Sequence, residues 1–357
     1  MQNTIKTYLE QAKIGRKQTY RNMTVFPVLS AYCLDLEYLL LDEALSEDAV
    51  EVVEVDQDGA VPELKVINRS PQMILILDGE ELVGAKQNRI VNTTILIQGN
   101  STTVIPVSCV EEGRWSYDSP RFSSNKRMMS SGLRAAKSEQ VCYSIRETGE
   151  FRADQGVIWD EIADKAERRG AASPSMAMAE IYEKDSPSIQ KYLKHFKQID
   201  SQVGAIFMIN GKVAGMDSLG KPGTFSKVFN KLVESYALDA IDWYDSGKEH
   251  KNLKSDVTKF MKTAHSARIE SQPSVGRGTD YRMESKRMTG FALALDDQVL
   301  HLCMFARENS LTTVYKETRA AWNFHKKLCD TPPGRRPYLW AGGCGTCPPR
   351  SSGRWYR

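Results

Sequence analysis

The feature that most constrains this chain is a succession of short β-favouring runs between residues 25 and 110, separated by turn residues. Such a succession predicts an antiparallel β-sandwich or a barrel-like N-terminal half. One run, Met73–Leu77, is apolar at every position, so we expect a central strand that is buried on both faces. The predicted strands are Val25–Leu29, Leu36–Leu41, Val50–Val55, Leu64–Ile67, Met73–Leu77, Ile90–Ile97 and Thr102–Val110.

After Trp115 the pattern changes to helices and β-hairpins. Asp154 can cap a helix that ends at Gly170, and Asn210-Gly211 suits the two-residue turn of a hairpin. Strands and helices fall into separate blocks, so the sequence predicts an α+β fold, in which helices and hairpins follow the β-rich half. The expected elements are helices over 125–147, 154–170, 173–196 and 225–240, and hairpins over 208–213 and 288–306.

We expect three regions along the chain. A β-rich domain with polar loops covers residues 1–118, an α+β domain packed against it covers 119–330, and a disordered or atypical tail covers 331–357. The tail has five Gly, five Pro and five Arg without apolar periodicity, so it cannot build a core. Cys344 and Cys347 have the spacing of half a zinc knuckle or a redox dithiol, but no second ligand pair follows them.

Composition excludes several classes of protein. Without the tail the chain has 43 basic and 45 acidic residues, which argues against a nucleic-acid partner. Its longest apolar runs have five residues, too few to cross a membrane, and no secretory signal is visible. We therefore expect a cytoplasmic protein with reduced cysteines. Because the five His are scattered and the common phosphate-loop and dinucleotide motifs are missing, the sequence predicts neither a metal site nor a cofactor.

A polar, charged segment over residues 77–89 lies between two apolar strands and is longer than a hairpin turn requires. Its last four side chains can bind an anion, and Gly84 allows a ligand to approach the backbone. The alternative is a solvated loop in which Asp78 and Glu80 pair locally with the cations, and the sequence alone favours this alternative. The four anion-binding candidates are Lys86, Gln87, Asn88 and Arg89.

A second polar cluster follows the predicted strand Thr102–Val110. Cys109 has no sequence-adjacent base, which favours a buried structural thiol over a nucleophile. Arg114 and Trp115 place a cation beside an indole, which suits either a phosphorylated aromatic ligand or a simple stack at the sheet edge. Because consecutive antiparallel strands usually pair, we expect Lys86 and Arg89 to lie close to Glu111 and Arg114.

For three more residues the neighbouring sequence gives little indication of a functional role. Trp159 and Asp217 can join a pocket between the two halves, although a core Trp and a turn Asp are the favoured interpretations. His301 lies inside a predicted strand and is expected to be packed there rather than to act as a catalyst.

Seven stretches of the chain match the pattern of one known family: residues 40–45, 77–89, 105–115, 203–207, 235–240, 290–293 and 299–305. In these stretches the chain resembles the ADP-ribosylglycohydrolase- and rhodanese-phosphatase-associated protein domain family. The most specific block is Gly84–Arg89, and the resemblance runs from about residue 19 to residue 305. By association it implies a ligand related to ADP-ribose and an ADP-ribosylglycohydrolase-type partner, and it supplies no catalytic residues.

Our first functional hypothesis is a binding or accessory protein for a phosphorylated nucleotide-like ligand. Cations would bind the phosphates, amides would contact the sugar or base edge, and an indole would stack. The residues concerned are Lys86, Arg89 and Arg114 for the phosphates, Gln87 and Asn88 for the sugar or base, and Trp115 for stacking.

Two alternatives leave open whether the protein is an enzyme. A hydrolase of such a ligand would use Glu80, Glu81 or Glu111 as the general base that activates water. A scaffold would bind only other proteins, through an exposed apolar patch.

Overall fold

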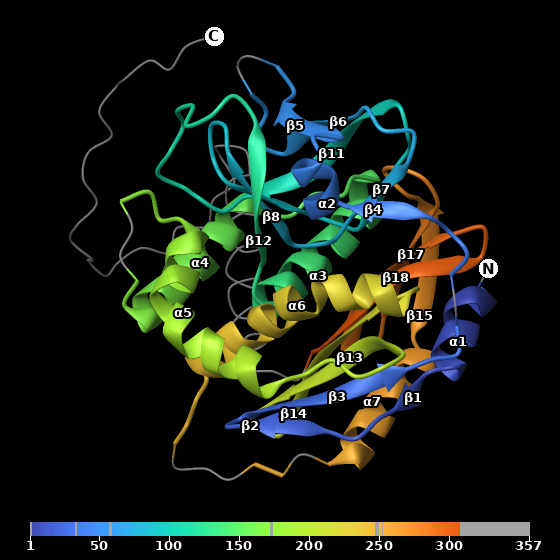
Figure 1. The fold of residues 1–357 in the computed structure, drawn as a ribbon. Helices are drawn as coiled ribbons and strands as arrows, with labels where there is room; N and C mark the ends of the chain where they lie inside the picture. Colours follow the sequence, from blue (N-terminus) through green and yellow to red (C-terminus); the bar gives the residue numbers. More distant parts are fainter. Residues whose placement is uncertain are drawn as a thin grey trace, which may run out of the picture. The chain divides into compact units, whose positions relative to one another are not determined.

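The computed structural model describes residues 2–32, 34–56, 59–171, 174–246, 250–251 and 253–307. In this part of the chain seven helices and eighteen strands form an α+β fold, and all but one of the strand pairings are antiparallel (Figure 1). This confirms the predicted fold class. The tail over 331–357, with Cys344 and Cys347, lies outside the described residues.

The largest sheet has nine strands and combines the first strands of the chain with those of its second half. Its members are β1 (Lys13–Ile14), β2 (Gln18–Tyr20), β3 (Met23–Leu29), β13 (Gln202–Ile209), β14 (Lys212–Leu219), β15 (Arg268–Pro273), β16 (Thr279–Glu284), β17 (Met288–Leu295) and β18 (Gln298–Ala306). The order is β1-β3-β13-β14-β18-β17-β16-β15, with β2 also paired to β3. The predicted run Val25–Leu29 therefore pairs with β13 and not with the strands that follow it in the sequence.

Both predicted hairpins are present in this sheet. Asn210 and Gly211 connect β13 to β14 with φ of 50° and 75°, as a type I′ turn requires. Asp296 and Asp297 connect β17 to β18 with φ of 48° and 61°, a conformation that Asp tolerates better than most residues. Local turn chemistry thus sets the register of both hairpins.

The two faces of the large sheet contribute to separate hydrophobic cores. Along β13, Ala205 and Phe207 belong to one core, whereas Ile206 and Met208 belong to the other, as strand alternation requires. Helix α6 (Pro222–Asp242) packs on the first face, which lies toward the smaller sheets in Figure 1. Helices α1 (Gln2–Glu10) and α7 (Lys254–His265) contribute to the second core.

Two smaller sheets curl around a third core as a half-barrel. The first contains β4 (Tyr38–Leu40), β7 (Met73–Ile76) and β10 (Ile95–Ile97); the second contains β5 (Val50–Glu54), β6 (Glu63–Asn68), β8 (Glu80–Gly84), β9 (Arg89–Val91), β11 (Ser101–Cys109) and β12 (Phe122–Met128). Strand β7 lies between β10 and β4, and its last three residues are fully buried, so the expected central strand is confirmed. The second sheet has the order β12-β8-β9-β11-β6-β5. Helix α2 (Leu41–Ser46) packs on the same core.

Two predicted elements are wrong. The single strand expected over 90–97 is broken into β9 and β10, because Thr93 and Thr94 turn inward to Asp280 and His301 at 3.2 Å and 2.7 Å. The helix expected from residue 125 begins only with α3 (Ser131–Thr148), because the residues before it form β12 and pair with β8. In both cases partners far away in the sequence override local propensity.

Two more helices, α4 (Gln155–Arg169) and α5 (Met178–His195), pack beside α6. The predicted start and end of α4 are confirmed. The Asp154 carboxylate accepts a hydrogen bond from the Val157 backbone N–H at 3.2 Å, and Gly170 ends the helix with φ of 60°.

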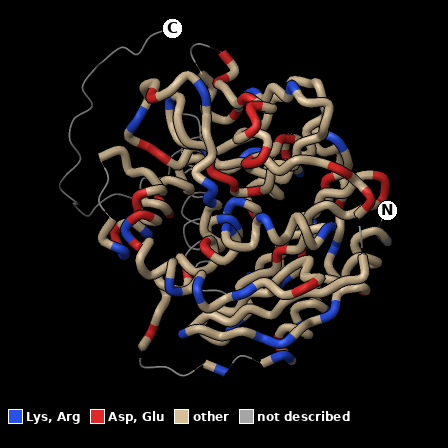
Figure 2. Tube along the Cα trace, in the orientation of Figure 1, with Lys and Arg blue, Asp and Glu red and all other residues tan. Residues whose placement is uncertain are grey.

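Charges of both signs are interspersed along the trace of the described residues (Figure 2). This distribution agrees with the near-neutral body expected from the composition. Within the described part of the chain, no helix is both long enough and apolar enough to span a membrane.

Candidate functional site

The segment 77–89, expected to be a solvated loop, is almost entirely buried. Strands β8 and β9 form its two sides, with Leu82 opposite Arg89, and only a short connection lies between them. Gly84 begins this connection with φ of 119°, and a Cβ there would lie 2.4 Å from the Ser119 Oγ, so only glycine fits. The loop interpretation is therefore wrong: the segment is an internal hairpin.

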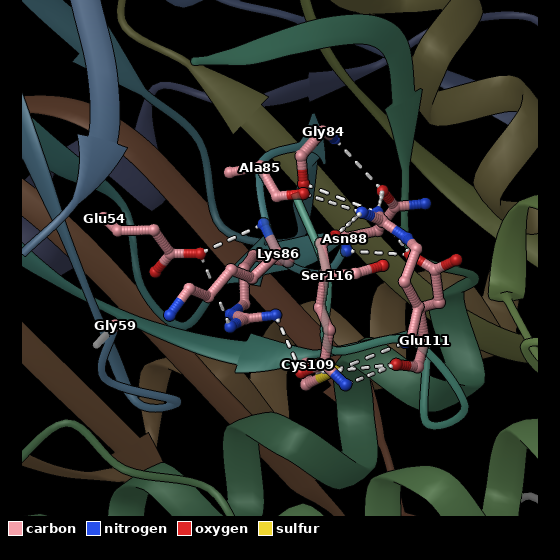
Figure 3. Close-up of polar contacts among 12 residues, drawn as sticks. Glu54, Gly59, Gly84, Ala85, Lys86, Asn88, Cys109, Glu111 and Ser116 are labelled. Atoms are coloured by element: carbon pink, nitrogen blue, oxygen red, sulfur yellow. Dashed lines mark hydrogen bonds and ion pairs between the residues drawn. The ribbon is translucent and has the colours of Figure 1, made fainter. Parts of the chain in front are cut away.

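Arg114 holds this connection in place through hydrogen bonds to the connection itself, in which Figure 3 labels Ala85 and Asn88, and to Glu111. Its guanidinium donates hydrogen bonds to the Ala85 carbonyl at 2.7 Å, to Asn88 Oδ1 at 3.1 Å and to Glu111 Oε2 at 2.7 Å. The same Glu111 oxygen accepts the Asn88 backbone N–H at 3.1 Å. Burial alone would raise the pKa of Glu111, but these two donors hold it below its usual value. Arg114 and Glu111 thus act together to order the backbone around Asn88.

The structure brings the two predicted polar clusters together. Strands β9 and β11 pair with Arg89 opposite Cys109, which confirms the expected proximity of the two segments. Gln87 connects them further, since its Nε2 donates to the Glu111 carbonyl at 2.9 Å. Its Oε1 accepts hydrogen bonds from Arg89 Nη1 at 3.1 Å and from the Cys109 thiol at 3.0 Å.

Arg89 is fully buried but uses only part of its hydrogen-bonding capacity. Its Nε and Nη2 have no hydrogen-bond partner among the described residues. The nearest carboxylate oxygen to Nη2 is Glu54 Oε1, at 4.0 Å, which is too long for a hydrogen bond. Burial lowers the pKa of Arg89 from its usual value, as expected for a desolvated cation. The unused edge of the guanidinium carries the two parallel donors that match an oxyanion.

Two aromatic side chains lie over these cations and are open to solvent. Trp115 is 47% exposed and Tyr117 is 53% exposed. The Lys86 Nζ lies 5.3 Å from the Trp115 ring centre and 5.2 Å from that of Tyr117, and the Arg89 guanidinium lies 5.6 Å from Trp115. We define the anion-site cluster as Glu54, Lys86, Arg89, Trp115 and Tyr117.

The chain was compared with protein families, curated proteins and solved structures. The model of the ARG and Rhodanese-Phosphatase-superfamily-associated Protein domain, ARPP-1, matches residues 11–305. The chain belongs to the ARPP-1 family. No curated protein and no solved structure matches it. The family name records an association with ARG and rhodanese-phosphatase superfamily proteins.

The three candidate bases of this ARPP-1 chain do not converge on one point. Glu80 is buried and bonded to Lys231 at 2.6 Å, whereas Glu111 is held by Arg114. Glu81 is one residue from Leu82 along β8 and therefore points to the opposite face of the strand pair from Arg89. It accepts a hydrogen bond from Asn125 at 2.6 Å, its Oε1 has no partner, and burial raises its pKa to about 7.

Cys109 is buried, as expected for a structural thiol. Burial raises its pKa above the usual value, which lowers the thiolate fraction near neutral pH.

The expected local pairing of Asp78 and Glu80 with Lys86 and Arg89 is wrong. Asp78 instead forms ion pairs with Lys137 and with Arg134, the latter at 3.3 Å. Both partners come from α3, about 55 residues further along the chain, where the sequence gives no local signal of the contact.

Asp78 belongs to a larger buried network in this ARPP-1 chain. Arg134 also pairs with Asp217 at 2.6 Å, and Asp217 lies 3.5 Å from His301 Nε2. Burial alone would raise the pKa of Asp217, but the Arg134 guanidinium lowers it overall. His301 is packed in its strand as predicted, with its Nδ1 2.7 Å from the Thr94 hydroxyl. The network connects the half-barrel to the large sheet.

Sequence reasoning missed Glu54 and Tyr117. A signal for Glu54 was available, because Val50, Val52 and Glu54 alternate on the buried face of β5. A carboxylate at an inward position of such a strand needs a partner inside the protein. The described residues contain no group of three or more His, Cys, Asp or Glu side chains placed to hold a metal ion.

Proposed function

We propose that this chain binds a phosphorylated, nucleotide-like ligand, such as ADP-ribose, at the anion-site cluster. The observation that carries the proposal is the unused edge of the Arg89 guanidinium, whose Nε and Nη2 are buried without a hydrogen-bond partner. Leaving a buried donor unsatisfied costs about 1–3 kcal/mol. An oxyanion that accepts from both nitrogens removes this cost and adds a charge-assisted contact.

The aromatic side chains support a ligand that carries a ring. Trp115 and Tyr117 expose about half of their surface directly above the buried cations. Stacking of a base on such a side chain contributes about 1–3 kcal/mol. A phosphate on Arg89 would satisfy its unpartnered donors, and a base on Trp115 would cover the exposed part of the indole.

The other predicted ligand contacts act indirectly in this proposal. Arg114 and Asn88 are occupied by hydrogen bonds that order the connection between β8 and β9. Gln87 orients Arg89 through its Oε1. These residues position the anion site, and Lys86 and Arg89 supply the charge that a phosphate needs.

One observation favours the hydrolase alternative. Glu81 has a pKa of about 7, which suits a general base near neutral pH. Its side chain, however, is fully buried and points to the opposite face of the strands from Arg89. A water activated by Glu81 would not reach a phosphate held by Arg89, so binding is the better-supported function.

Ligand-induced thermal stabilisation tests the proposal. The full chain is melted with ADP-ribose, AMP or inorganic phosphate, and a ligand at a hundredfold excess over its dissociation constant adds about 2.7 kcal/mol of stability. We expect stabilisation by the two nucleotides and its loss in Trp115→Ala. Tyr143→Ala is the matched control, since Tyr143 lies on α3 and is 50% exposed.

Two outcomes contradict the proposal. The first is that no nucleotide shifts the melting temperature, which would favour a scaffold that binds other proteins. The second is that Trp115→Ala and Tyr143→Ala keep the same ligand shift as the parent chain.

A further inference from the structure

Glu54 is buried beside Arg89 and also has an unused polar atom. It is 6% exposed at the end of β5. Its Oε1 accepts the Lys86 backbone N–H at 3.3 Å and lies 4.0 Å from Arg89 Nη2 (Figure 3). Its Oε2 has no hydrogen-bond partner among the described residues. No donor from the described part of the chain satisfies this oxygen, so it is available to a hydrogen-bond donor of a ligand.

A bare anion fits this arrangement poorly. An oxyanion on the Arg89 edge would lie within a few ångströms of the Glu54 carboxylate, where like charges repel strongly in a desolvated site. Such an anion would satisfy Arg89 but leave Glu54 Oε2 without a donor. A ligand that offers both an oxyanion and a nearby hydrogen-bond donor would satisfy both residues.

The chemistry of the neighbours restricts the donor. An ammonium group would be repelled by Lys86 and Arg89, whose charged groups lie 5.3 Å and 5.6 Å from the Trp115 ring centre. A base N–H is less suitable, because the base is expected to stack on the exposed Trp115 ring. A hydroxyl group is neutral, donates readily to a carboxylate and is carried by the same molecule as the phosphate in a sugar phosphate.

Gly59 keeps one side of the carboxylate uncrowded. Its φ is 72°, and a Cβ at this position would lie 3.3 Å from Glu54 Oε2 and 3.2 Å from Lys86 Cδ. Figure 3 places Gly59 beside these two side chains. The missing side chain therefore avoids a tight contact with the unpartnered oxygen.

We propose that Glu54 is a specificity-determining residue that accepts a hydrogen bond from a sugar hydroxyl while Arg89 holds the phosphate. This inference rests on the proposed function and narrows its ligand to phosphate esters of a hydroxylated sugar such as ribose. The vicinal diol of ribose presents two donors, which match the two oxygens of one carboxylate.

Calorimetric titration of the full chain with AMP, 2′,3′-dideoxy-AMP and inorganic phosphate tests this inference. The two nucleotides share the phosphate and the base and differ only in the two hydroxyls. A hydrogen bond to a charged group predicts that AMP binds at least about tenfold more tightly than its dideoxy analogue. Glu54→Gln should reduce this ratio to about twofold and strengthen the binding of inorganic phosphate, because the repulsion is removed.

Glu51→Gln is the matched control, since Glu51 lies on the same strand but pairs with Arg69 and Arg121. It should keep the parent's preference for AMP. Equal binding of AMP and its dideoxy analogue by the parent chain would overturn the inference and leave the proposed function standing. If neither nucleotide binds, the proposed function fails and the inference fails with it. A folded Glu54→Gln chain that keeps the parent's full preference for AMP would also overturn the inference, because the hydroxyls would then be recognised by another residue.

Discussion

The guanidinium of Arg89 and the carboxylate of Glu54 are both buried, and their nearest atoms are 4.0 Å apart. This separation keeps some electrostatic attraction but excludes a hydrogen bond. Both residues therefore retain polar atoms without a partner in the described part of the chain. Buried charged groups normally form hydrogen bonds with one another, and this pair does not; we therefore propose that a ligand binds between them.

Arg114 should stabilise the fold more than it contributes to ligand contact. Arg114→Ala removes donors from the Ala85 carbonyl, Asn88 and Glu111, and should lower the free energy of unfolding by about 2–3 kcal/mol. Urea unfolding measures this change. Arg121→Ala is the control, because Arg121 is 56% exposed and its ion pair should contribute less than about 1 kcal/mol. Equal stability of the two variants would contradict the positioning role.

The buried network around Arg134 should be more sensitive than exposed ion pairs. Arg134→Met leaves Asp78 and Asp217 without their main shared cation, which typically costs about 3–5 kcal/mol. Arg146→Met breaks pairs that are one-third exposed and should cost about 1 kcal/mol or less. Thermal or urea unfolding of the two variants compares them directly, and similar losses would show that burial of the network matters little.

Glu81 should make stability depend on pH. Burial raises its pKa from 4.5 to about 7, so between these values the folded state binds a proton that the unfolded state does not. The stabilisation is complete below pH 4.5 and is lost as the pH rises through 7. Glu81→Gln cannot titrate, so the stability of the parent relative to this variant should fall by about 2 kcal/mol from pH 5 to pH 8. Parallel stability curves would refute the assignment.

Cys109 should react slowly with alkylating reagents in the native protein. Its thiol is buried, and its raised pKa leaves little thiolate at pH 7. Mass spectrometry of the peptide that contains Cys109 should show little iodoacetamide adduct before unfolding and complete modification after it. Rapid native modification would instead indicate a reactive nucleophile.

Local sequence predicted those parts of the fold that depend on local chemistry. The Asn210-Gly211 turn and the Asp154 cap are determined by backbone conformation and by hydrogen bonds within a few residues. The break at Thr93 and Thr94 was not predictable in this way, because their partners lie about 190–210 residues further along the chain. Tertiary contacts therefore divide the expected strand into β9 and β10.

In the candidate site, too, contacts between neighbouring strands were predictable, whereas contacts with distant elements were not. Pairing of neighbouring strands predicted that Arg89 would lie near Glu111 and Arg114. The partners of Asp78 come from α3 and could not be inferred from segment 77–89 alone. The only sequence signal for Glu54 was a carboxylate at an inward-facing position of β5. Its proximity to Arg89 depends on the curl of the half-barrel and could not be predicted from the sequence.

The proposed function depends most on the unused edge of the Arg89 guanidinium, which would hold the phosphate of a nucleotide-like ligand. The most direct test is the dissociation constant of AMP and of adenosine for the parent chain and for Arg89→Lys, which keeps the charge but removes the paired donors. Arg121→Lys is the control. We predict that the parent binds AMP much more tightly than adenosine and that Arg89→Lys loses most of this preference, with AMP affinity falling about tenfold or more. Unchanged AMP affinity in a folded Arg89→Lys protein would contradict the account.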